Sequence, residues 1–198
     1  MKKIMLLLLI SISSFAQSYK FSVGSNITSF VFNNSDAANP PSLRPSSGLH
    51  VSLSSERELK VLSKHLLTEF GISYNQFNSV GDVQNIPFSY STDFIGLGMG
   101  VGPRLSLGKG VTFIAKGHAS TSKMVNGNQF LLNRYVDLSG DDQFNSLRTM
   151  FGYSFELNKQ ISPQVGMFIK YQHLNSISGK TSLNIIPSTF SIGLSLTK

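Results

Sequence analysis

The chain contains no cysteine and no tryptophan, and charged residues make up only 14% of its 198 residues. Without cysteine there is no disulfide framework, no thiolate zinc site and no thiol for lipid attachment. Soluble domains carry about 25% charged residues, so the low charge content favours an outer wall that faces lipid. After the first ten residues, no stretch reaches the roughly 18 consecutive apolar residues of a transmembrane helix.

An export signal is predicted at the start of the sequence. A positively charged beginning, an apolar core over 4–10 and small residues just before Gln17 match a secretory signal peptide. Residues 1–16 are therefore predicted to be removed, which leaves 198 − 16 = 182 residues. That length suits one domain over 17–198.

The basic balance does not point to nucleic acid as a partner. The net charge is +7, and it falls to +5 when Lys2 and Lys3 leave with the signal. The remaining lysines and arginines are scattered, without the run or stripe that a nucleic-acid surface shows. A polyanionic lipid surface is the expected neighbour.

Apolar residues alternate with small or polar ones along eight later segments, as in strands with two different faces. Over 90–107, for example, Ile95, Leu97 and Met99 alternate with glycines. Most segments reach the roughly 9–11 residues that a β-strand needs to cross a bilayer. Strands are predicted at 19–31, 48–55, 65–77, 90–107, 111–123, 145–157, 164–175 and 185–197.

The connections alternate in length, which predicts the topology. Transmembrane barrels have short periplasmic turns and longer external loops, so both termini are expected on the periplasmic side. The segment 55–64 fits either an oversized turn or a single helical turn. Short connections fall at 108–110 and 158–163, and longer ones at 32–47, 78–89, 124–144 and 176–184.

This pattern resembles the small eight-stranded outer-membrane barrels of OmpA/OmpX type. The run Phe190-x-Ile192-x-Leu194-x-Leu196 is similar to the insertion signal read by the barrel-assembly machinery. The resemblance implies an all-β, antiparallel, up-and-down transmembrane barrel in the outer membrane of a double-membraned bacterium. It implies outer-membrane lipid and the assembly machinery as partners, and no cofactor.

A soluble barrel of lipocalin type would invert the two faces. The membrane version is favoured by strand length, by the absence of the tryptophan that lipocalins share, and by aromatic residues near strand ends. These aromatics are expected to form an interfacial girdle. They are Tyr74, Phe77, Tyr90, Phe94, Tyr153 and Tyr171.

Charged residues on the small-residue face are expected to line the lumen. Four fixed cations face two anions, so the charges either form a plug of salt bridges or leave a cationic lumen for water or a small anion. The expected lumen residues are His50, Glu69, Arg104, Lys116, His118, Arg148, Glu156 and Lys170.

One catalytic constellation can be drawn from the sequence. A His-x-Ser pair on one strand resembles the outer-membrane lipid A deacylases, which implies Ser120 as nucleophile, His118 as base and Glu156 as orienting group. The sequence after the pair departs from that family, and His118 has the parity of the lumen face. We therefore expect no catalytic activity. The histidines lack ligand spacing, so no metal site is expected.

The best candidate for a partner surface is the third external loop, with Phe130, Leu131, Arg134 and Tyr135. Exposed apolar patches often mark interaction sites, and Tyr and Arg are typical interface anchors. The alternative is a strand that continues beyond the membrane and pairs as a hairpin. The expected role is structural, adhesive or accessory to an envelope complex; the alternatives are a narrow pore for water or small anions and a lipid A-modifying hydrolase.

Overall fold

The computed structural model describes residues 18–32, 43–61, 64–83, 86–177 and 183–197, so the predicted signal peptide lies outside the described residues. Within these ranges the protein is all-β, apart from one short helix. The elements are β1 (Ser18–Phe32), β2 (Arg44–Val61), β3 (Lys64–Val83), β4 (Ile86–Gly108), β5 (Val111–Leu131), β6 (Arg134–Asp137), α2 (Asp142–Asn145), β7 (Arg148–Gln160), β8 (Val165–Ile177) and β9 (Leu183–Thr197).

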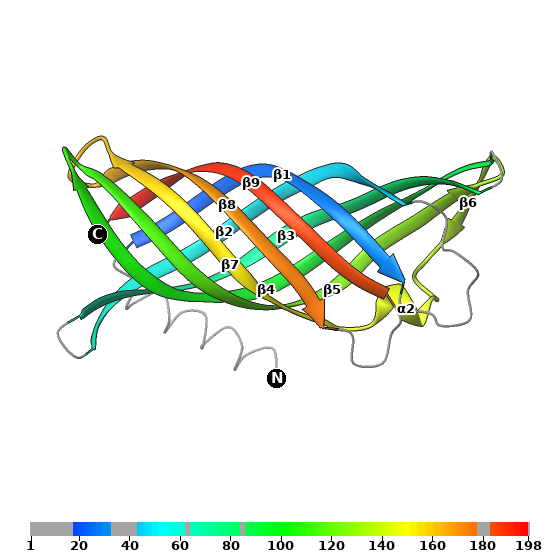
Figure 1. The fold of residues 1–198 in the computed structure, drawn as a ribbon, viewed down its shortest axis with the longest axis horizontal. Coiled ribbons are helices and arrows are strands. Elements are labelled where there is room, and N and C mark those ends of the chain that lie inside the picture. The colour runs from blue at the N-terminus through cyan, green and yellow to red at the C-terminus, as the bar shows by residue number, and fades with distance from the viewer. Residues whose placement is uncertain (1–17, 33–42, 62–63, 84–85, 178–182, 198) are drawn as a thin grey trace.

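The sheet closes on itself through eight antiparallel strands. The order of strands around the ring is β1, β2, β3, β4, β5, β7, β8 and β9, and each strand pairs with the next in this order. The ring is closed because β9 pairs with β1. Figure 1 shows β1 and β9 side by side, with β6 and α2 at the end opposite the one where β9 finishes. The strand β6 lies outside the ring and pairs with β5. The expected eight-stranded antiparallel barrel is therefore confirmed.

The stagger of the ring follows from the strand register. Starting at Ile114 and following paired residues through Glu156, Lys170 and the remaining strands, the row returns to β5 at Met124. The shift is 124 − 114 = 10 residues for eight strands. Such a stagger tilts the strands by about 35–45° and leaves a lumen that side chains can just fill.

The two faces of the barrel differ as the alternation predicts. Large apolar side chains point outward, with Met99 59% and Ile192 60% exposed, while small and polar residues point inward. The glycines of β4 lie on the inner face, where Gly100 leaves room for the ring of His118. No helix in the described ranges is long and apolar enough to cross a membrane.

Several strands are longer than the sequence predicts. The segment 55–64 is neither an oversized turn nor a helical turn, because β2 runs to Val61 and β3 begins at Lys64. Across this extension Glu58 pairs with Leu67 in register, so backbone hydrogen bonds continue through charged residues. The expected loop at 78–89 is mostly strand too, since β3 and β4 are described up to Val83 and from Ile86.

The predicted aromatic girdle is wrong for three of its six members. Phe77 and Phe94 are buried inside the barrel with their ring centroids 5.2 Å apart, and Tyr90 packs against the same internal cluster. Both phenylalanines alternate with outward residues of their strands, so strand parity places them inside. Tyr74 and Tyr153 keep outward positions, and Tyr171 does so as well.

Candidate functional site

Six charged side chains from six strands meet inside the barrel and form what we call the ionic layer. Lys20 Nζ lies 3.0 Å from Glu56 Oε1 and 2.6 Å from Glu156 Oε1. Lys170 Nζ lies 3.0 Å from Glu69 Oε1. The layer consists of Lys20, Glu56, Glu69, Lys116, Glu156 and Lys170.

Lys116 holds this layer together. Glu56 and Glu69 are directly opposite on neighbouring strands and both point inward, an arrangement that is repulsive for like charges. Lys116 Nζ lies 2.5 Å from Glu56 Oε1 and 2.5 Å from Glu69 Oε2, and its side chain is only 1% exposed. A buried cation between two buried anions therefore stabilises all three charges.

The ionic layer is neutral, with three lysines and three glutamates. Glu69, Lys116, Glu156 and Lys170 were expected in the lumen, but Lys20 and Glu56 were missed. Lys20 has the same inward parity as Ser22, so the alternation along β1 is sufficient to predict it inside the barrel. Glu56 lies one residue beyond the predicted strand 48–55, and its inward position follows only from the longer β2.

The six charges of the ionic layer are arranged as the plug of salt bridges, the first of the two interpretations of the lumen, whereas the other two predicted lumen cations lie outside this layer. Arg104 lies near the short-turn end, with its side chain 44% exposed and Nη2 3.4 Å from Glu58 Oε2. Arg148 is buried at the opposite end, where its guanidinium donates to Leu183 O at 2.8 Å and also to Gln143 O.

An apolar cluster fills the barrel mouth at the end where α2 lies. The ring of Phe144, from α2, stacks on Tyr90 with centroids 5.3 Å apart and meets Phe30 edge-on at 6.1 Å. The Asp141 side chain caps the helix, because its Oδ1 accepts a hydrogen bond from the backbone N–H of Gln143 at 2.7 Å. We call this set the mouth cluster; it comprises Phe30, Phe77, Phe94, Met124, Leu138, Phe144, Met150, Leu183 and Ile185.

Between the ionic layer and the mouth cluster lies a polar chamber of about 70 Å³. His50 lines it and lies 2.7 Å from Asn75 Oδ1 through Nδ1, while Ser122 and Gln172 also face it. On the other side of the ionic layer, a vestibule of about 470 Å³ reaches Lys20 and Glu56. The lumen is thus filled at two levels by side chains of the described residues.

The predicted catalytic residues are not assembled as a triad. His118 Nε2 lies 2.7 Å from Ser154 Oγ rather than being bonded to Ser120, and Glu156 is paired with Lys20. His118 is buried on the inner face, so the group is turned away from the apolar outer wall. In the part of the chain that the structure describes, no cluster of His, Cys, Asp or Glu could hold a metal ion.

The partner-loop candidates lie on a hairpin formed by the end of β5 and by β6. Phe130 and Tyr135 are paired across it, with ring centroids 5.1 Å apart, and Leu131 pairs with Arg134. The hairpin alternative is therefore confirmed. Phe130 and Leu131 are half-buried, whereas Arg134 is exposed and Tyr135 is 78% exposed.

The turn of this hairpin breaks a local rule. Leu132 and Asn133 have φ values of 51° and 59°, a left-handed turn that favours glycine and asparagine. Leu132 is also 63% exposed, so a large apolar side chain occupies both a strained and a solvated position.

A local hydrogen-bond pair follows the hairpin. The hydroxyl and the backbone N–H of Ser139 both donate to the Asp137 carboxylate, and these bonds lower the pKa of that carboxyl.

A closed eight-stranded ring with an apolar outer face and a filled polar lumen defines the fold of the small outer-membrane β-barrels. Among solved structures, the chain is similar to Neisserial surface protein A, with a TM-score of 0.54, 10% identity, and coverage of 91% of this chain and 97% of that one. At this identity the likeness concerns the fold alone.

Two further solved structures are similar. The attachment invasion locus protein Ail of Yersinia pestis has 10% identity and a TM-score of 0.38, with coverage of 91% of this chain and 99% of that one. A major outer membrane protein from Thermus thermophilus has 11% identity and a TM-score of 0.47, with coverage of 90% and 98%. No protein-family model matches the chain, and no curated protein matches it.

Replacing Lys116 by methionine is expected to lower the free energy of unfolding by about 3–5 kcal/mol, because two buried carboxylates lose their shared cation. Arg104→Gln, at a half-exposed pair, should cost less than about 1 kcal/mol. Urea unfolding in detergent micelles measures both. The double variant Lys116→Met with Glu69→Gln should recover part of the loss. Equal costs for the two single variants would contradict the assigned role of Lys116.

Proposed function

We propose that this protein spans the bacterial outer membrane as a closed, non-catalytic barrel that presents its outer hairpin to a protein partner, in an adhesive or accessory role. In this orientation the short turns and both termini are periplasmic, and β6 and α2 lie outside the cell. The observation that carries the proposal is a lumen filled at two levels beneath an exposed, locally strained hairpin.

The filled lumen supports a role that does not depend on passage through the barrel. A water file or a small anion would have to pass both the ionic layer and the mouth cluster. Lys116 and Glu156 are each engaged in close ion pairs with side chains 1% exposed. Phe144 and Met150 are buried in the mouth cluster. Both barriers would have to rearrange for conduction.

The hairpin supports a role in contact with another protein. Leu132, Tyr135 and Val136 expose 63%, 78% and 48% of their surfaces, and Arg134 lies beside them. A left-handed leucine costs about 1–2 kcal/mol, which glycine would avoid. Local strain of this kind concentrates at functional positions. An apolar tip with a tyrosine and an arginine has the composition of a protein interface.

Wild-type protein in planar lipid bilayers is expected to show no discrete single-channel conductance. Phe144→Ala should also remain silent, because the ionic layer persists beneath the opened mouth. Conductance should appear only when Phe144→Ala is combined with Lys116→Ser and Glu69→Ser, which together remove bulk from both levels and leave the net charge of the ionic layer unchanged. Steady channels from the wild type would contradict a closed barrel and favour the pore.

A photo-crosslinking residue at position 135 in intact cells is expected to give a discrete protein adduct, whereas the same residue at position 109 should not. Lys109 lies in the turn at the other end of the barrel and is also exposed. Leu132→Gly should stabilise the turn yet reduce the adduct, since the apolar tip is lost. Adducts that are equal at both positions, or unaffected by Leu132→Gly, would contradict partner binding by the hairpin.

A further inference from the structure

The outer wall carries a trough of about 770 Å³ that runs across β2, β3, β4, β5 and β7. It follows two neighbouring rows of paired residues. One row joins Met99 to Ala119 and then to Phe151, and the next joins Thr68 to Val101 and then to Gly117. The trough exists because Gly117 and Ala119 are small and stand between larger side chains of the adjoining strands.

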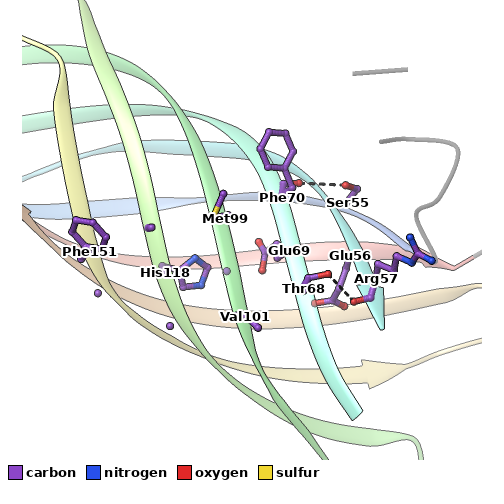
Figure 2. A pocket seen from close by; sticks show the side chains of 14 residues that line it. Ser55, Glu56, Arg57, Thr68, Glu69, Phe70, Met99, Val101, His118 and Phe151 are labelled. Carbon is purple, nitrogen blue, oxygen red and sulfur yellow. Dashed lines mark hydrogen bonds between the residues drawn. The ribbon is translucent and has the colours of Figure 1, made fainter. Parts of the chain in front are cut away.

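The two ends of the trough differ in chemistry. Figure 2 shows Phe151 at one end and Arg57 at the other, with Met99 between them. Near Arg57 the wall is polar: the Thr68 hydroxyl donates to Arg57 O at 3.1 Å, and the Ser55 hydroxyl donates to Phe70 O at 3.4 Å. Each hydroxyl oxygen keeps lone pairs that can accept a hydrogen bond.

This polarity matches the depth of each end in a bilayer. Arg57 lies on the outward face towards the short-turn end of β2, where the ladder continues to Val61. From there the trough passes Met99 and Ala119 towards the middle of the wall. A guanidinium is well suited to bind phosphate, and an apolar channel leading away from it suits an acyl chain.

We propose that this trough binds one glycerophospholipid of the periplasmic leaflet, with its phosphate at Arg57 and one acyl chain along Gly117 and Ala119. The inference rests on the membrane location and orientation given under the proposed function. The hydroxyls of Ser55 and Thr68 accept from a headgroup that carries its own donors, such as a glycerol or an ammonium group.

The trough can be filled without disturbing the fold. The nearest atom to a Cβ built on Gly117 is Val101 O at 4.0 Å, so a larger side chain there enters open space. Gly117→Leu should therefore occupy the acyl-chain path. Ala115→Leu is the matched control, because Ala115 shares the strand and the outward face of Gly117 without lining the trough.

The experiment reconstitutes the full chain in phosphatidylcholine vesicles containing phosphatidylglycerol, extracts it gently and counts retained lipids by native mass spectrometry. Wild type and Ala115→Leu should each retain one phosphatidylglycerol. Arg57→Gln should lower that occupancy roughly five-fold, as expected for one exposed charge contact. Gly117→Leu should abolish it.

Other outcomes overturn the inference in distinct ways. Equal retention in all four proteins would remove the phosphate-binding role of Arg57, and so would equal retention of diacylglycerol when it replaces phosphatidylglycerol in the vesicles. A dimer of the wild type that Gly117→Leu abolishes would assign the trough to a second copy. If the chain inserts into vesicles but retains no lipid, this inference fails alone; if it does not insert, the proposed function fails.

Discussion

Backbone N–H and C=O groups inside a bilayer have no water to bond with, and this constraint shapes the rest of the structure. The chain meets it by pairing β9 with β1, so that the ring has no open edge in its wall. Closure with a stagger of ten residues leaves a narrow lumen, and side chains from opposite strands then meet within it.

That narrow lumen determines the chemistry of the interior. Charges removed from bulk water must be paired, and the ionic layer pairs three lysines with three glutamates drawn from six strands. Lys116 is central because it separates Glu56 from Glu69. Towards the end of the barrel where α2 lies, the lumen changes from polar to apolar, and Phe144 of α2 packs inside the mouth cluster. The same barrel thus combines an apolar outer wall that has no open edge with a filled interior.

Much of this arrangement could be predicted from alternation. The parity of Lys116, Glu156 and Lys170 predicts their inward positions, and the alternation along β4 predicts its outward apolar side chains. The full length of the strands could not be predicted, because backbone pairing such as that of Glu58 with Leu67 continues through segments that lack the alternation of apolar and polar residues. The partners of Lys20 depend on the ring stagger, which no single strand encodes. The alternation along β4 predicts an inward Phe94, whereas its position near the end of the predicted strand favours the interfacial aromatic girdle; the structure agrees with the alternation.

The most direct test of the account is electrophoretic mobility of the outer-membrane fraction in SDS, with and without boiling. A barrel closed by inter-strand hydrogen bonds and held by a buried ionic layer should resist unheated SDS and migrate faster than its boiled form. The account predicts that the protein is found in this fraction and shifts on heating. A soluble periplasmic protein whose mobility does not change would contradict it, because the apolar outer face could not then be a membrane wall.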